Sequence, residues 1–279
     1  MIHPLDQSLV LESLGPNVWH SPCSPLYWNT IGPFGGWIAA MLLHAVLGEE
    51  SARGDPVALQ AQFIGPMRQA PFRVRTACLK QNRSTAFWRS EILQAGEGGG
   101  SEAVCAHATI TLSNWRDTFS LADARMPPAP PAASLPALSQ RSYRQPAFLS
   151  RYDFRLVSGP PLAAADNMHS LVWLRDAEPR TLDARSITAL CDTSPPSIWL
   201  RLSEPVIVTT LVYNVFFRAS AAAMASAGTE HVLIDSTCDV DTAGFYDQNS
   251  NLWSAGGELL AQTQQLTWFA DKPLRPIPA

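Results

Sequence analysis

The sequence contains few charges and few of the residue pairs that hold metals or cross-link a chain. Charged residues make up 16% of 279 residues, and the formal net charge is −4 at pH 7. This balance gives no electrostatic reason to expect nucleic acid or an anionic membrane as a partner. None of the six histidines forms an H-x-x-x-H pair, and no C-x-x-C spacing occurs among the five cysteines. We therefore expect reduced cysteines, no metal site and no disulfide framework.

Other signals are missing as well. Residues 1–14 lack the basic start and long apolar run of a signal peptide, and no later run is long enough to span a bilayer. The expected location is therefore the cytoplasm, without a membrane partner. No G-x-S-x-G sequence occurs, which argues against a Ser-His-Asp α/β-hydrolase. The scarcity of charge is typical of a protein with much buried sheet or a large subunit interface.

The most distinctive stretch that is present runs from Asn29 to Gly48. It opens with a turn-forming cluster that includes Gly35 and Gly36, and it continues without charge from Trp37 to Leu47. A helix that is apolar on nearly all sides is buried, and this one is too short to cross a bilayer. The glycines leave the first backbone N–H groups of the helix bare. The stretch predicts a core helix whose N-terminus a ligand can approach.

Two similar halves flank a Pro/Ala tract near the middle of the chain, at residues 126–136. In each half a helix and an antiparallel meander are expected, which predicts an α+β protein. The tract predicts a semi-rigid linker, so the expected domains are 1–125 and 146–279, joined by 126–145. The expected strands are 57–63, 72–80, 84–94 and 103–112, then 152–157, 169–175, 206–218, 231–240, 252–254 and 258–269, with a second helix at 182–190 and a hairpin-like turn at 247–250.

Several short motifs, in this order, resemble those of the acyl-CoA thioesterase II family of the thioesterase-like superfamily. They are Gly32-Pro-Phe-Gly-Gly36 before an Ala-rich helix, Phe63-Ile-Gly-Pro-Met67, Arg83-Ser-Thr-Ala-Phe87, Leu252-Trp-Ser254, Gly257-Glu-Leu-Leu-Ala261 and Thr263-Gln-Gln265. The resemblance spans nearly the whole chain. It implies a double hotdog, in which two tandem repeats each wrap an antiparallel sheet around a central helix and the two sheets join.

The resemblance also implies a catalytic site in the second half. In that family a water molecule that attacks the thioester is held by an Asp, a Thr and a Gln, which match Asp192, Thr209 and Gln265 here. Thr210 is the alternative to Thr209 because the local strand register is ambiguous, and Gln264 would point away from Gln265 in a regular strand. Without the resemblance, Asp192 would be read as a carboxylate that ends or caps a helix. The Cys-Asp-Thr-Ser-Pro-Pro continuation departs from the family pattern.

Each of these groups has a chemical role that fits its type. Burial between two helices would raise the pKa of Asp192 and suit it as a base near neutral pH. The amides of Gly35 and Gly36, at the positive end of a helix dipole, are candidate donors to an oxyanion. The same glycines could serve only helix–sheet packing, and His44 is expected to be a core or interface histidine.

The function expected from these observations is hydrolysis of an acyl-CoA, in lipid metabolism, to a free acid and CoA. CoA enters only as part of the substrate, and no other cofactor is expected. A non-catalytic acyl-CoA or acyl-ligand binding protein is the alternative, and an interaction module that uses its sheet edges is a third hypothesis. A homodimer of double-hotdog chains is a further expectation. The acyl chain length is not specified by the sequence.

Overall fold

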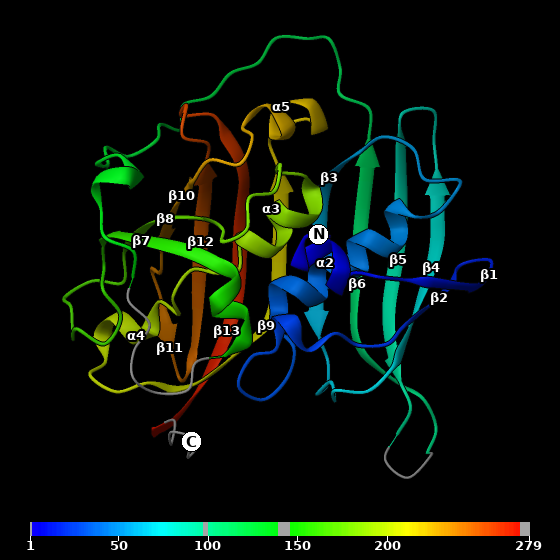
Figure 1. Ribbon diagram of the computed structural model, residues 1–279, viewed down its shortest axis with the longest axis horizontal. Helices are drawn as coiled ribbons and strands as arrows, with labels where there is room; N and C mark the ends of the chain where they lie inside the picture. Colours follow the sequence, from blue (N-terminus) through cyan, green and yellow to red (C-terminus); the bar gives the residue numbers. More distant parts are fainter. Residues whose placement is uncertain (1, 97–99, 139–145, 274–279) are drawn as a thin grey trace.

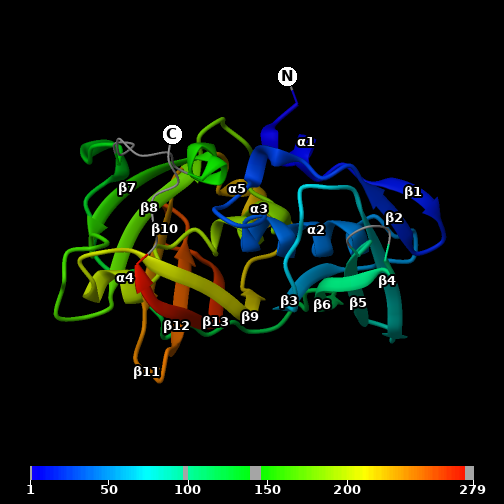
Figure 2. The same cartoon turned by 90° about the horizontal axis from the view of Figure 1, so that it is seen from below.

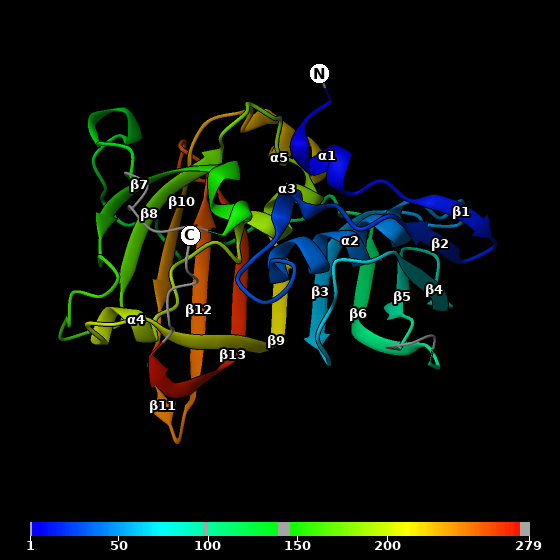
Figure 3. The ribbon, with the colours of Figure 1, turned by 60° about the horizontal axis from the view of Figure 1, so that its bottom comes forward.

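A single large antiparallel sheet organises the molecule, and two helices lie side by side on one of its faces (Figure 1). The computed structural model describes residues 2–96, 100–138 and 146–273. The strands of the 13-stranded sheet follow the order β1-β2-β4-β5-β6-β3-β9-β13-β12-β10-β8-β7, and β11 pairs with β12 alone. The two halves meet where β3 of the first pairs with β9 of the second, for example Gln60 with Asn214. The sheet is continuous across this junction (Figure 3), as the sequence predicts.

The elements agree with most of the predicted ranges. The helices are α1 (Pro4–Ser8), α2 (Gly35–Leu47), α3 (Ala184–Leu190), α4 (Ile198–Arg201) and α5 (Ala221–Ser226). The strands are β1 (Glu12–Gly15), β2 (Val18–Ser21), β3 (Asp55–Phe63), β4 (Phe72–Gln81), β5 (Thr85–Gln94), β6 (Ala103–Ser113), β7 (Tyr152–Ser158), β8 (Ser170–Asp176), β9 (Val206–Phe217), β10 (Val232–Thr237), β11 (Asp241–Thr242), β12 (Phe245–Trp253) and β13 (Leu259–Pro273).

The turn predicted at 247–250 is wrong. These residues lie inside β12, and the hairpin turns earlier, at Ala243 and Gly244, both of which have a positive φ. Such a pair suits the primed turns whose twist matches that of the flanking strands. The side chain of Asp247 stabilises the loop before β11. Its Oδ1 accepts hydrogen bonds from the backbone N–H groups of Asp239 and Val240 at 3.1 and 2.8 Å. The carboxylate caps a neighbouring loop rather than forming a turn.

Helix α2 forms the centre of the main core. Ten of its thirteen residues are buried, and the helix packs on the inner faces of β3, β4, β5 and β6. The inner residues of those strands, such as Leu59, Val74 and Trp88, belong to the same core. Burial of most of its surface explains why the sequence shows no polar stripe along this helix. Among the described residues, no helix is both long and apolar enough to cross a membrane.

The Pro/Ala tract lies against the outer face of the second half of the sheet. Met126, Ala129 and Leu135 pack on a small cluster that includes Trp173, and the indole Nε1 of Trp173 donates to the carbonyl of Pro130 at 2.8 Å. The segment crosses from the end of β6 to the far strands (Figure 1). Residues 139–145 of the predicted linker lie outside the described residues, so the predicted domain limits remain a prediction.

Candidate active site

Helices α2 and α3 run antiparallel, and the end of α3 approaches the start of α2. Helix α3 begins with a capping box in which Asp183 and Ser186 satisfy each other's backbone N–H groups, and it ends at Leu190 with Cys191 as its C-cap. Asp192 follows directly. A Cβ atom on Gly35 would lie 2.9 Å from Asp192 Oδ2, and one on Gly36 would lie 2.7 Å from the carbonyl of Ala189. Only glycine permits this approach, so the glycine pair serves both packing and access to the carboxylate.

A chain of hydrogen bonds links Asp192 to the sheet. Gln265 of β13 donates from Nε2 to Asp192 Oδ1 at 3.0 Å, and Thr210 of β9 donates from Oγ1 to Gln265 Oε1 at 2.8 Å. Gln265 is buried. The three groups therefore come from three segments, the end of α3 and two neighbouring strands. The structure brings together Asp192 and Gln265 of the predicted residues, and Thr210 joins them.

Thr209 does not belong to this chain. Tyr213 faces the helices, so a regular strand would also turn Leu211 and Thr209 inward. The register instead shifts between β9 and β13, so that Leu266 pairs with Val212 while Thr267 pairs with Thr210. Leu211 is the extra residue of a β-bulge, which reverses the alternation beyond it. The bulge turns Thr210 toward Gln265, and Gln264 is exposed on the opposite face.

Asp192 occupies a site that favours its neutral form. Desolvation raises the pKa of its carboxyl group to about 7, while the backbone N–H of Gly36 and the amide of Gln265 act in the opposite direction. Protein atoms surround the carboxyl closely, yet the residue retains some solvent contact. Such a carboxyl can exchange a proton near neutral pH and can be reached by water.

The two glycine amides differ in their surroundings. The N–H of Gly36 faces the Asp192 carboxylate and lowers its pKa, although among the described residues the well-aligned hydrogen bond to that carboxylate comes from Gln265. The backbone N–H of Gly36 therefore interacts with the carboxylate. Gly35 is the first residue of α2, where backbone N–H groups lack a partner within the helix. Gly35 is thus the better placed of the two predicted donors.

Aromatic residues that the sequence analysis did not assign to the site surround it. The hydroxyl of Tyr213 donates to the carbonyl of Thr188 at 2.7 Å and so ties β9 to the last turn of α3. Phe34, which precedes α2, stacks on Phe148 with ring centroids 4.3 Å apart. The ring of Phe63 lies 3.3 Å from the position of a Cβ on Gly35. The spacing of these residues along the chain carries no signal, because the contacts join distant segments.

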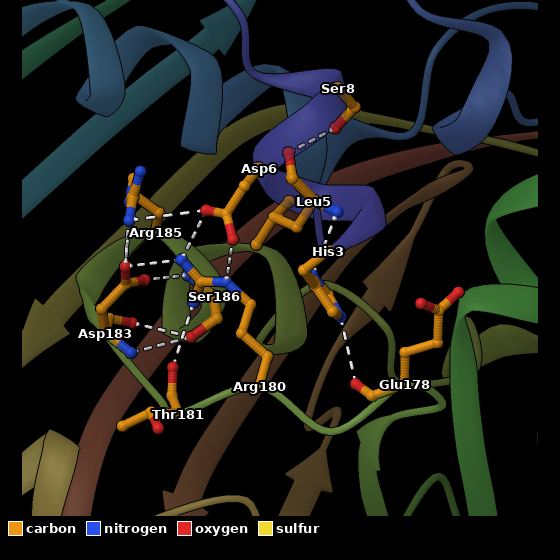
Figure 4. Close-up of polar contacts among 10 residues, drawn as sticks. All are labelled: His3, Leu5, Asp6, Ser8, Glu178, Arg180, Thr181, Asp183, Arg185 and Ser186. Carbon is orange, nitrogen blue, oxygen red and sulfur yellow. Dashed lines mark hydrogen bonds and ion pairs between the residues drawn. The ribbon is translucent and has the colours of Figure 1, made fainter. Parts of the chain in front are cut away.

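The opposite end of the helix pair is closed by charged residues (Figure 4). Arg180, whose side chain is 8% exposed, pairs with Asp6 of α1 at 2.9 Å and with Asp183 at 2.8 Å. Arg185 also contacts both carboxylates, at 3.6 and 2.6 Å. Burial lowers the pKa of the neighbouring His44 to about 4. A neutral core histidine agrees with the sequence analysis, and this end of the pair serves to hold α1.

Comparisons with known proteins agree with this geometry. A sequence model of the acyl-CoA thioesterase N-terminal domain matches residues 24–113, and one of the C-terminal domain matches residues 123–269. The chain belongs to the acyl-CoA thioesterase family. The activity of the family is thioester hydrolysis, and the family resemblance drawn from the sequence motifs is confirmed. No curated protein matches the sequence.

Solved structures share the double-hotdog fold over the full length of the chain. A conserved protein of unknown function with a hot dog fold from Alicyclobacillus acidocaldarius is 30% identical, with a TM-score of 0.91 over 98% of this chain and 100% of the other. The acyl-CoA thioesterase II TesB2 from Mycobacterium marinum is 19% identical, with a TM-score of 0.74 over 95% and 98%. A tesB protein from Mycobacterium avium subsp. paratuberculosis is 16% identical, with a TM-score of 0.76 over 95% and 98%.

Proposed function

We propose that the protein hydrolyses acyl-CoA thioesters to a free carboxylic acid and CoA, with Asp192 as the general base. The observation that carries the proposal is the environment of this carboxyl group. Its pKa is raised to about 7, it receives a hydrogen bond from Gln265, and it faces the first turn of α2. A base that titrates near neutral pH can take a proton from water and later return it.

The reaction follows from the positions of these groups. A water molecule beside Asp192 attacks the thioester carbonyl carbon while the carboxylate takes its proton. The developing oxyanion is stabilised by the N–H of Gly35 and by the positive end of the α2 dipole. The carbon–sulfur bond then breaks, and the sulfur of CoA leaves with a proton from Asp192. Gln265 keeps the carboxylate in one orientation, and Thr210 keeps Gln265 in place. In this scheme Thr210 takes the role that the sequence analysis assigned to Thr209.

Replacement of Asp192 tests the proposal. Asp192→Asn is expected to lower kcat by at least about 100-fold, the scale of general acid–base catalysis. Thiol release from a panel of acyl-CoAs that differ in chain length measures this loss and identifies the preferred substrate. Asp123→Asn, a matched change at an exposed site, should leave turnover unchanged. Unaltered turnover in Asp192→Asn would show that another group is the base.

The same panel separates hydrolysis from the alternative function. If no acyl-CoA is hydrolysed but one raises the melting temperature, the protein is an acyl-CoA binding protein, because a ligand that binds only the folded state stabilises it. If neither effect occurs, the hypothesis of an interaction module gains support. A cytoplasmic location, a role in lipid metabolism and the need for no cofactor beyond the CoA of the substrate complete the proposal.

A further inference from the structure

The segment that carries Asp192 is bonded to the sheet at three points. Residues 192–197 lie between α3 and α4 and include two consecutive prolines, Pro195 and Pro196. Proline has no backbone N–H and a restricted φ, so this segment has few hydrogen bonds of its own to make. It follows α3, which lies with α2 on the inner side of the sheet (Figure 2). Such a segment needs partners outside itself to keep one conformation.

Two glutamines hold the two ends of this segment. Gln248 of β12 and Gln265 of β13 are directly paired, so their side chains lie next to each other on the inner face. Gln265 donates to Asp192, the first residue of the segment, at 3.0 Å. Gln248 Oε1 accepts from the backbone N–H of Ser197, the last residue, at 2.9 Å and from its hydroxyl at 3.1 Å. Gln248 and Ser197 are both buried, so water does not compete for these bonds.

Three serine hydroxyls hold the middle of the segment. Ser194 Oγ lies 2.5 Å from Ser236 Oγ of β10, and Ser236 Oγ lies 2.7 Å from Ser250 Oγ of β12. Ser236 and Ser250 are directly paired on their strands. All three serines are buried, and a buried hydroxyl that loses its partner is costly. Residues of β10, β12 and β13 therefore bind the start, the middle and the end of one short segment.

We propose that Gln248 and Ser236 are positioning residues for thioester hydrolysis, which hold residues 192–197 against the sheet and so keep the Asp192 carboxyl in place and shielded from water. This inference rests on the proposed role of Asp192 as the general base. Neither residue has to touch the substrate. A base acts efficiently only when it is held close to its working position, so loss of either contact should lower kcat and leave KM nearly unchanged.

The surroundings of Asp192 show what a loosened segment would change. The titratable groups that face it are Tyr152, Cys191, Tyr213 and Tyr246, and burial raises the pKa of each, so all four are neutral near pH 7. Among the described residues, no charged side chain contributes to the raised pKa of Asp192, whose main cause is desolvation. Entry of water should therefore lower this pKa toward the ordinary value of Asp, about 3.9.

Rates of thiol release between pH 5 and 9 test the positioning role. Gln248→Met keeps the length of the side chain but loses the acceptor, and kcat is expected to fall about tenfold with KM within about twofold of wild type. The acid limb of its pH profile should move down by about one unit. Ser236→Ala should act in the same direction, and Ser197→Ala, which keeps the backbone N–H, should lose less. Ser170→Ala, next to Ser236 on β8, and Gln60→Met, at an exposed site on β3, are matched controls that should resemble wild type.

A measurement without turnover separates this inference from the proposed function. If the wild type hydrolyses no acyl-CoA, the proposed function fails, yet the contacts to the segment can still be tested by denaturant unfolding at pH 8. Asp192→Asn removes a desolvated carboxylate and should stabilise the protein there. That gain should fall by about half in the Gln248→Met background, because the carboxylate is then already hydrated.

The outcomes are decisive for the two residues. Circular dichroism checks that each variant keeps its fold, and Ser236→Ala carries the same tests if Gln248→Met does not fold. A lower kcat with a shifted acid limb, or a smaller gain from Asp192→Asn, supports the positioning role. If the acid limb and the gain both stay as in the wild type, Gln248 and Ser236 do not hold Asp192, and the inference is wrong.

Discussion

The hydroxyl of Thr210 donates a hydrogen bond to Gln265 Oε1 across 2.8 Å, and it thereby determines which end of the glutamine amide faces Asp192. An amide oxygen can only accept, so Thr210 holds that oxygen away and directs the amide nitrogen to the carboxylate. Gln265 Nε2 then donates to Asp192 Oδ1 at 3.0 Å. Thr210 acts on the carboxylate through Gln265 and is a positioning residue.

Removal of this hydroxyl should therefore disorder the glutamine. Thr210→Val keeps the shape of the side chain but loses the donor, and we expect kcat to fall about 10- to 100-fold, equivalent to roughly 1–3 kcal/mol. Thr210→Ser keeps the donor and should recover most of the activity. Thr209→Val, which alters the neighbouring hydroxyl outside the chain of hydrogen bonds, is the matched control. Equal losses in the two valine variants would contradict this role.

The raised pKa of Asp192 predicts a cost in stability. The folded state holds the proton up to a pKa of about 7, whereas an unfolded Asp releases it near pH 3.9. The stability that this group contributes is complete below about pH 4 and is lost as the pH rises through about 7. Asp192→Asn should therefore raise the free energy of unfolding at pH 8 by about 1–3 kcal/mol, after allowance for residual solvent contact.

Denaturant unfolding of Asp192→Asn and wild type between pH 4 and 8 measures this difference. The difference in the free energy of unfolding should be small at pH 4 and should be largest above pH 7. In the wild type, kcat should rise over the same range as the carboxylate ionises. A stability difference that does not vary with pH would mean that the two proteins differ in packing instead of ionisation.

A substitution at Gly36 tests whether the close approach of α2 and α3 matters for stability and activity. A Cβ at this position would meet the carbonyl of Ala189 at 2.7 Å and Asp192 Cβ at 2.9 Å. Gly36→Ala should lower the free energy of unfolding by about 1–3 kcal/mol, the usual cost of overpacking, and should reduce activity by moving Asp192. Gly65→Ala is the control, since no atom lies within 4 Å of its added Cβ. Thermal unfolding and thiol release are measured on both variants.

A substitution at Arg180 tests how strongly its ion pairs hold α1 against the rest of the protein. Its side chain is buried between Asp6 and Asp183, and its loss removes one of the two arginines that pair with each of these carboxylates. Arg180→Met should lower the free energy of unfolding by about 1–3 kcal/mol at pH 7. Arg73→Met, which breaks an exposed pair with Glu102, should have little effect.

The pH dependence of this loss has a definite sign. Hydrogen bonds and charges from Arg180 lower the pKa of Asp183 against the effect of its burial, to about 2. The stability that Asp183 contributes is present above its unfolded pKa and disappears as the pH falls through about 2. The difference between Arg180→Met and wild type should therefore be larger at pH 7 than at pH 2.5. Denaturation at both pH values measures it, and a larger difference in acid would contradict this pairing.

The fold could be predicted where local pattern and tertiary structure agree. The run without charged residues from Trp37 to Leu47 predicted α2. The alternation of inward-facing and outward-facing residue types along 72–80 predicted β4. The turn predicted around Asp247 failed because its carboxylate caps a distant loop, a use that local propensity does not reveal. The choice between Thr209 and Thr210 depends on a bulge at Leu211, which is a property of the pairing between β9 and β13. No single segment of sequence contains that information.

The closed end of the helix pair has a consequence for stoichiometry. The two repeats have a similar architecture, but the two ends of the α2–α3 pair differ. At the first, glycines meet Asp192. At the second, Asp6 of α1 pairs with Arg180 and Arg185 (Figure 4). The neighbouring His44 is buried, and desolvation lowers its pKa to about 4. The second end therefore anchors the N-terminal helix α1. Each chain should accordingly bind one substrate molecule, not two.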